Sequence, residues 1–145
     1  MSTSPQLIPS GYNAWWSTEI HLWWRDFDYL GHVTAASYGS LYEEAFGRFM
    51  TVAWGTEFPS YVVGAMSIRY LHEIVRGVDA VRVFVAIEQV GTASISARLV
   101  AVDSEGRECS TAENRYVAWD RDMRCSRPIT SAERAGLGAL TKPRS

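Results

Sequence analysis

A single amphipathic helix is the strongest structural signal in this chain of 145 residues. Thr34 is suited to the N-cap of the helix, while Gly55 and Pro59 favour its end. Between these positions the apolar side chains recur at helical spacing on one wide stripe: Tyr38, Leu41, Tyr42, Ala45, Phe46, Phe49, Met50, Ala53 and Trp54. A stripe of this width has to be buried, so the rest of the chain must provide a surface that covers it.

The rest of the chain alternates between apolar and polar residues, as strands do. Strands are expected over Ser17 to Asp26, Tyr61 to Val75, Ala80 to Val90, Ala93 to Val102 and Arg107 to Trp119. Tight turns at residues 76–79 and 103–106 favour antiparallel neighbours. A capping box at Thr130 and Glu133 predicts a short terminal helix. The expected fold is therefore α+β, with a curved antiparallel β-sheet wrapped around one long central α-helix.

The pattern predicts one domain over residues 17–135, because the chain is long enough for a single core. Residues 1–16 are expected to form a loose N-terminal leader, in which Pro5 and Pro9 disfavour regular structure. Residues 136–145 are expected to form a C-terminal tail that frays at its end.

Composition excludes several classes of protein. The net charge is −2, and no basic block indicates binding to nucleic acid. No apolar run is long enough to cross a bilayer, and the first ten residues lack the features of a signal peptide. Cys109 and Cys125 lack metal-ligand spacing, so we expect free thiols. These features predict a cytoplasmic protein without a membrane partner or a bound metal.

The segment Arg25–Val33 carries the chemistry that the sequence predicts. It places Asp26, Asp28, Gly31 and His32 just before the long helix. A carboxylate at a helix N-terminus can activate water or attack a carbonyl carbon, and free amides of the helix can hold the oxyanion that forms. This combination suggests acyl transfer or hydrolysis.

The same segment carries a resemblance to a known family. The matching residues are Asp26-Phe27-Asp28-Tyr29-Leu30-Gly31-His32-Val33, then Tyr38 and Tyr42-Glu43-Glu44-Ala45, and later Ile68-Arg69-Tyr70-Leu71 with Gly77 and Asp79, and Gly91 with Ser94. With the order of helix and strands, these residues resemble hotdog-fold acyl-CoA thioesterases of the 4-hydroxybenzoyl-CoA thioesterase-like group. The resemblance covers residues 17–135 and implies the hotdog fold. The chain departs from the family at Thr34-Ala35, where relatives have two asparagines.

The resemblance implies that Asp28 is the catalytic residue, acting as a general base on water or as a nucleophile. The alternative is that Asp28 only caps the loop. Gly31 is expected to allow an unusual backbone angle or a close approach of the thioester, with oxyanion donors among the amides of residues 31–36. His32 is expected to polarise the carbonyl group or orient Asp28, although a histidine that only tethers the loop fits equally well.

Five further residues are candidates for binding the substrate. Arg69 is suited to the phosphates of coenzyme A, although it also fits an ordinary surface charge. Tyr38 lies on the apolar stripe, where core packing is the simpler interpretation, and Tyr70 belongs to the matching strand. Thr92 and Ser94 are expected to contact the acyl group or a bound water, unless they are plain strand hydroxyls.

The predicted function is hydrolysis of an acyl-CoA or acyl-carrier thioester, with coenzyme A entering as part of the substrate and no separate cofactor. A non-catalytic acyl-CoA or acyl-carrier binding protein is the main alternative, because of Thr34-Ala35. A hotdog hydratase or dehydratase fits less well, because those enzymes space their aspartate and histidine further apart, in a loop that contains proline.

The resemblance also implies an oligomer. Relatives close the cleft with a second subunit, so a homodimer or homotetramer is expected. Four tryptophans between Trp15 and Trp24 fit a buried interface, or an aromatic wall for a flat ligand.

Overall fold

The computed structural model of the chain describes residues 12–141. At its centre lies the helix α2, Ala35–Trp54. Its first turn is capped by Thr34, whose hydroxyl accepts a hydrogen bond from the Ser37 amide at 3.1 Å, and Gly55 ends it in the left-handed conformation, with φ 64°. Both predicted ends of the helix are confirmed. The predicted stripe is also buried, through Tyr38, Leu41, Tyr42, Ala45, Phe46, Phe49 and Met50.

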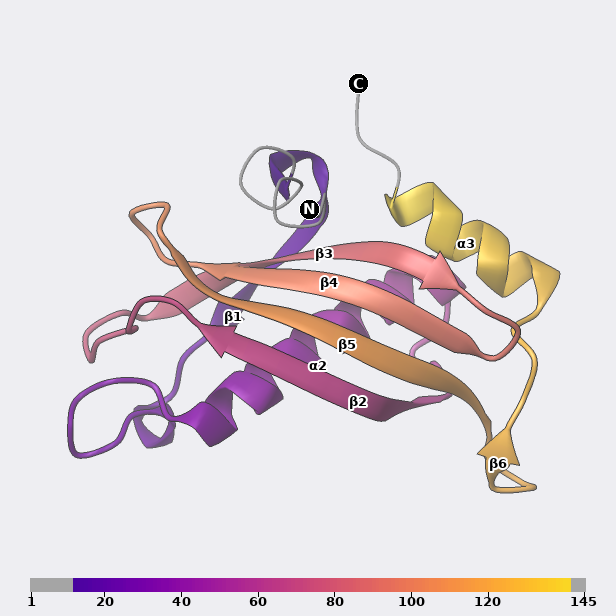
Figure 1. Ribbon diagram of the computed structural model, residues 1–145, viewed down its shortest axis with the longest axis horizontal. Helices are drawn as coiled ribbons and strands as arrows, with labels where there is room; N and C mark the ends of the chain where they lie inside the picture. The colour runs from indigo at the N-terminus through magenta and orange to yellow at the C-terminus, as the bar shows by residue number, and fades with distance from the viewer. Residues whose placement is uncertain (1–11, 142–145) are drawn as a thin grey trace.

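Six strands form one antiparallel sheet in the order β1-β3-β4-β5-β2, with β6 paired to β5. Their bounds are β1 Trp16–His21, β2 Tyr61–Tyr70, β3 Ala80–Val90, β4 Ser94–Val102, β5 Glu108–Asp120 and β6 Cys125–Ser126. Figure 1 shows α2 lying across one face of this sheet. The predicted α+β architecture, a sheet around one long helix, is confirmed.

The first strand is shorter than the predicted Ser17 to Asp26. It ends at His21, and a 3-10 turn, η2 Trp24–Asp26, follows it. The Asp26 carboxylate accepts a hydrogen bond from the Trp23 amide at 2.7 Å, which bends the chain back on itself. A polar side chain that bonds nearby backbone therefore ends the strand before the Asp-rich loop.

The second strand is also shorter than predicted, because it ends at Tyr70 instead of Val75. The Leu71 and His72 amides both donate to the Cys109 carbonyl, at 2.9 and 3.1 Å, so the regular ladder stops there. The chain then leaves the sheet and runs toward the loop that precedes α2. This departure brings residues 71–76 to the candidate site.

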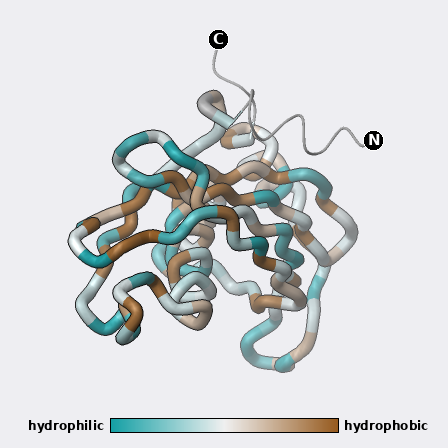
Figure 2. Tube along the Cα trace, turned by 60° about the vertical axis from the view of Figure 1, so that its left-hand side comes forward, coloured by the Kyte–Doolittle hydropathy of each residue, from teal (hydrophilic) through white to brown (hydrophobic). Residues whose placement is uncertain are grey.

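The core lies between α2 and the sheet. Figure 2 shows hydrophobic segments in the strands and hydrophilic ones in the turns at the edges. A smaller cluster of Phe84, Val100 and Val102 is covered by Tyr12 and Trp15. Part of the predicted leader therefore packs against the sheet; residues 1–11 lie outside the described part of the chain.

The C-terminal helix α3, Ser131–Thr141, packs against the end of α2. The predicted capping box is confirmed, because the Glu133 amide donates to the Thr130 hydroxyl at 3.1 Å and the Thr130 amide to the Glu133 carboxylate at 3.0 Å. The helix continues into the predicted tail of residues 136–145, and Leu137 is buried. Residues 142–145 lie outside the described range.

Two glycines of α3 differ in their surroundings. A Cβ atom at Gly136 would lie 1.9 Å from the Ala53 carbonyl oxygen, so the backbones of α3 and α2 approach closely there. A Cβ atom at Gly138 would meet no heavy atom within 4 Å. Only Gly136 is therefore required for the close packing of the two helices.

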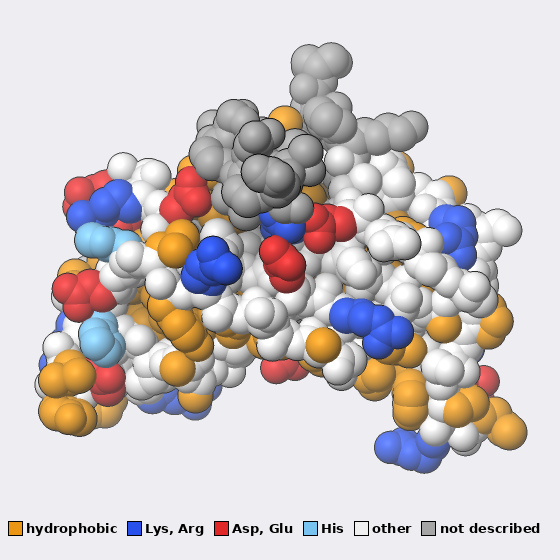
Figure 3. Space-filling model, in the orientation of Figure 1, with side chains coloured by type: hydrophobic (Ala, Val, Ile, Leu, Met, Phe, Trp, Pro, Cys, Tyr) orange, Lys and Arg blue, Asp and Glu red, His pale blue; other side chains and the backbone are white. Residues whose placement is uncertain are grey.

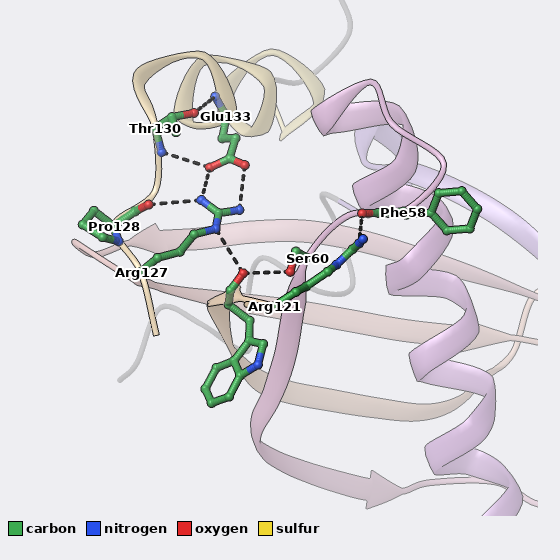
Figure 4. A network of polar contacts seen from close by, with 8 residues as sticks. Phe58, Ser60, Arg121, Arg127, Pro128, Thr130 and Glu133 are labelled. Atoms are coloured by element: carbon green, nitrogen blue, oxygen red, sulfur yellow. Dashed lines mark hydrogen bonds and ion pairs between the residues drawn. The ribbon is translucent and has the colours of Figure 1, made fainter. Parts of the chain in front are cut away.

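Arg127 ties α3 to the sheet, as Figure 4 shows. Its guanidinium group donates to both carboxylate oxygens of Glu133 at 2.8 Å and to the Trp119 carbonyl at 3.1 Å. The guanidinium carbon also lies 5.5 Å from the centre of the Trp54 ring. The hydrogen bonds from Arg127 hold the pKa of Glu133 below its ordinary value.

Both cysteines carry free thiols, as predicted, and Cys109 is buried whereas Cys125 is exposed. Burial raises the pKa of the Cys109 thiol to about 11. Within residues 12–141, no helix has the length and apolar character needed to cross a membrane.

Candidate active site

The loop before α2 folds back on itself around Asp28. The Asp28 amide donates to the His32 carbonyl, and the Gly31 amide donates to the Asp28 carbonyl, each at 3.0 Å. Gly31 has φ +81°, in the left-handed region that a side chain disfavours. The prediction that glycine allows an unusual backbone angle at this position is therefore confirmed, because the turn requires that angle.

The Asp28 carboxylate is held by its own loop. One oxygen accepts hydrogen bonds from the Leu30 amide at 2.9 Å and the His32 amide at 3.4 Å. The other oxygen lies 3.2 Å from Nε2 of the His32 ring. The Asp28 side chain keeps 26% of its surface exposed, so water can still reach the carboxylate.

The segment that follows β2 lies antiparallel to this loop. The Val33 amide donates to the Ile74 carbonyl at 2.9 Å, and the Arg76 amide donates to the Gly31 carbonyl at 2.8 Å. Ile74 is buried, which fixes the segment against the core. The Arg76 guanidinium group donates to the Asp28 carbonyl at 2.7 Å. The backbone that carries Asp28 is therefore fixed from both sides.

The His32 ring lies between two carboxylates. Its Nε2 faces Asp28 at 3.2 Å, and its Nδ1 faces a Glu73 oxygen at 3.3 Å. Figure 3 shows histidine and acidic side chains close together at one end of the molecule. This is the end at which Figure 1 places the turn after β2 and the loop before α2.

A cleft of about 370 Å³ opens beside the His32 ring. Tyr38 and Tyr70 contribute to its wall, with ring centres 5.2 Å apart and ring planes at 72°. Burial, with smaller effects from Cys109 and Tyr70, raises the pKa of Tyr38 to about 12, so its phenol is neutral at pH 7. The lining residues are His32, Val33, Ala35, Tyr38, Tyr70, Leu71, His72 and Glu73.

Two backbone amides at the start of α2 are available to a ligand. The amides of residues 30–34 donate to acceptors within the loop or to Ile74, and the Ser37 amide donates to the Thr34 hydroxyl. Within this described stretch, only the Ala35 and Ala36 amides have no acceptor in the protein. Ala35 also lines the cleft, where its N–H can face an oxyanion.

The comparison with protein families identifies the chain. A sequence model described as the thioesterase-like superfamily matches residues 22–137. The chain belongs to the thioesterase-like superfamily. The family predicted from the Asp28 segment is therefore confirmed. The comparison with curated protein sequences found no match.

Solved structures of low sequence identity share the fold of this thioesterase-like chain. The PA5185 protein of Pseudomonas aeruginosa is 19% identical, with a TM-score of 0.79, over 90% of this chain and 95% of its own. A Thermus thermophilus thioesterase, in complex with coenzyme A and zinc, is 24% identical, with a TM-score of 0.76, over 88% and 96%. The 1,4-dihydroxy-2-naphthoyl-CoA thioesterase of Synechocystis is 15% identical, with a TM-score of 0.74, over 88% and 98%. These similarities confirm the hotdog fold.

The structure brings together some of the predicted site residues of this thioesterase-like chain. Asp28, Gly31 and His32 share one loop, and Tyr38 and Tyr70 line the cleft next to it. The Gly31 amide donates to the Asp28 carbonyl and is not free for an oxyanion. Of the amides predicted as oxyanion donors, those of Ala35 and Ala36 have no acceptor within the loop.

Three other predicted residues do not line this cleft. Arg69 is an exposed residue of β2 outside the cleft wall. Ser94 pairs with Val117 at the end of the sheet opposite to Tyr70, about 25 Å away along the strands. Thr92 precedes Ser94 at that end, and its carbonyl accepts the Ile129 amide at 2.8 Å. Within one chain these three residues lie apart from the cleft, and their roles in binding stay predictions.

Glu73 is the site residue that the sequence did not indicate. The predicted strand over Tyr61 to Val75 placed it inside a regular β-ladder. The structure instead places it beside the His32 ring, because the chain leaves the sheet after Tyr70. The contact joins residues 41 positions apart, which neither periodicity nor a local motif can predict.

Proposed function

We propose that this thioesterase-like protein is an acyl-CoA thioesterase that releases a free carboxylic acid and coenzyme A. The observation that supports this most is the Asp28–His32 pair, 3.2 Å apart, next to a cleft and to free amides at a helix start. A thioester carbonyl is electrophilic and its thiolate leaves readily, so one general base and two oxyanion donors suffice for hydrolysis.

In the proposed reaction, Asp28 takes a proton from water while the water oxygen bonds to the thioester carbon. The carbonyl oxygen becomes an oxyanion, which the Ala35 and Ala36 amides stabilise. The oxyanion then collapses, the carbon–sulfur bond breaks, and the thiolate of coenzyme A receives the proton. Direct attack by Asp28 is less favoured, because one of its oxygens already accepts two backbone amides.

The thioester is expected to enter through the cleft next to Tyr38 and Tyr70. Their rings and the neighbouring Val33 and Leu71 provide an apolar surface for the acyl group or the pantetheine arm. No cofactor takes part in the proposed reaction, since water supplies the atoms that are added and the carboxylate only carries a proton.

A second candidate function follows from one observation. Asp28 already bonds its own loop, and it does not belong to the lining of the cleft. A protein that binds acyl-CoA or an acyl carrier without turnover would show the same arrangement. The two functions differ in whether thiol is released.

The experiment is to incubate the protein with a panel of acyl-CoA thioesters and to follow free thiol. We expect release by the wild type, reduced at least about 100-fold in Asp28→Asn. The matched control is Asp122→Asn, an exposed aspartate in the turn between β5 and β6, which should keep wild-type activity. Binding without release would support the binding protein, and water addition to an enoyl thioester would support a hydratase.

We further propose that the chain works as a homodimer. Strand β2 is one edge of the sheet, and its Val62 and Val63 side chains are exposed. A second cleft, of about 780 Å³, lies between α2 and β2 and would be closed by a partner subunit. Sedimentation equilibrium should give twice the mass of one chain, or four times that mass for a tetramer. A monomer under assay conditions would contradict this proposal.

A further inference from the structure

The residue that the proposed reaction has not yet used is Glu73, which faces the ring of His32. We propose that Glu73 is a positioning residue: it holds the Nδ1–H of His32, so that Nε2 is directed at Asp28 and shares a proton with its carboxylate. This inference rests on the proposed thioesterase activity for its catalytic consequence. The hydrogen-bond arrangement itself can be tested without turnover.

The backbone around Glu73 is fixed on both sides. Before it, the Leu71 and His72 amides share the Cys109 carbonyl. After it, the buried Ile74 accepts the Val33 amide at 2.9 Å. The side chain of Glu73 is therefore presented from a rigid position to the loop that carries His32.

The contacts of the ring restrict where its protons lie. An ionised carboxylate only accepts hydrogen bonds, so each ring nitrogen that faces one needs a proton between the pair. The distances are 3.3 Å from Nδ1 to Glu73 and 3.2 Å from Nε2 to Asp28. With Nδ1–H bound to Glu73, the second proton is shared between Nε2 and Asp28. The Nε2–H hydrogen bond then holds the Asp28 carboxylate in the position from which it takes the proton from water.

The other charged or titratable side chains near the His32 ring do not compete for its contacts with Asp28 and Glu73. Arg76 donates to the Asp28 carbonyl and therefore faces the backbone of the loop. His72 lines the same cleft as Glu73. Among the described residues, Asp28 and Glu73 are the only carboxylates that contact the His32 ring.

The contact between Glu73 and His32 contributes little to the stability of the fold. Glu73 keeps 57% of its side-chain surface exposed, and exposed ion pairs contribute little to folding. Loss of Glu73 should therefore affect turnover while the folded state remains intact.

The test compares Glu73→Ala and Glu73→Gln with Glu105→Ala, an exposed glutamate in the turn between β4 and β5 that lines neither the cleft next to His32 nor the second cleft. We expect Glu73→Ala to lower kcat about 10- to 100-fold, with KM and the thermal midpoint little changed. Glu73→Gln should keep more activity, because its amide oxygen still accepts the Nδ1–H. Wild-type kcat in an active Glu73→Ala protein would overturn the inference.

A second readout does not depend on turnover. The chain has three histidines, so the ¹⁵N signals of the His32 ring can be assigned with a His32→Gln variant. We expect protons on both Nδ1 and Nε2 in the wild type and loss of the Nδ1 proton in Glu73→Ala. The same ring signals in both proteins would overturn the inference, even if no thioester were hydrolysed. Absence of thiol release by the wild type would instead contradict the proposed function.

Discussion

The two ends of the molecule are held together in different ways. At the C-terminal end, Arg127 binds both oxygens of Glu133 at 2.8 Å, and Gly136 lets two helix backbones touch. At the site end, Asp28 and Glu73 contact His32 through single contacts of 3.2 and 3.3 Å. The C-terminal end has a bidentate ion pair and closely packed helices, whereas the contacts at the site end are single and partly exposed.

This difference indicates that one end of the molecule stabilises the fold and the other is suited to chemistry. Short bidentate contacts and close packing stabilise the fold. Single contacts around a partly exposed histidine contribute little to stability, and they leave a proton free to move. We therefore expect substitutions at the two ends to separate activity from stability.

The largest expected effect is the loss of activity in Asp28→Asn, at least about 100-fold in kcat/KM, or about 2.7 kcal/mol in the barrier. The amide keeps one oxygen for the Leu30 amide but cannot take a proton from water. The free energy of unfolding, measured with urea, should change little. A large loss of stability would mean that Asp28 belongs to the structural end of the comparison.

The sequence predicted regular elements better than the site. Local patterns in the sequence specify the helix and the strands. The apolar stripe from Tyr38 to Trp54 and its caps predicted α2, and the alternation in residues 80–119 predicted β3, β4 and β5; all four elements were confirmed. The family was also predicted, because the segment around Asp28 and His32 is contiguous. Contacts between distant segments were not predictable, as Glu73 on His32 shows.

The placement of Thr92 and Ser94 has a similar cause. Gly91 and Ser94 match the family's bend before a strand, yet strand direction alone decides at which end of the sheet a bend lies. β4 runs from Ser94 to Val102, and Tyr70 lies across the sheet from Ala101. Resemblance along the chain did not reveal this separation in space.

The next effect concerns packing at the C-terminal end. Gly136→Ala should lower the free energy of unfolding by about 1–3 kcal/mol, because its Cβ would overlap the Ala53 carbonyl. Gly138→Ala is the matched control on the same helix, and its Cβ meets open space, so equal or higher stability is expected. Equal losses in both variants would contradict the assignment of the close helix contact to Gly136.

The smallest effect depends on pH. The pKa of Glu133 is lower in the folded protein than in the unfolded chain, so the folded state binds fewer protons. Its contribution to stability is complete above the unfolded value of about 4.3 and is lost as the pH falls through the folded pKa. Urea unfolding of the wild type and Glu133→Gln should show a smaller acid-dependent loss in the variant. Parallel curves would contradict this assignment.

The most direct test of the account measures thiol release per folded molecule in Asp28→Asn and Gly136→Ala. We predict that Asp28→Asn keeps wild-type stability and loses thiol release, whereas Gly136→Ala loses stability and keeps thiol release. Wild-type rates of acyl-CoA hydrolysis in folded Asp28→Asn would contradict it, because the reaction would then take place without the carboxylate on which the site is built.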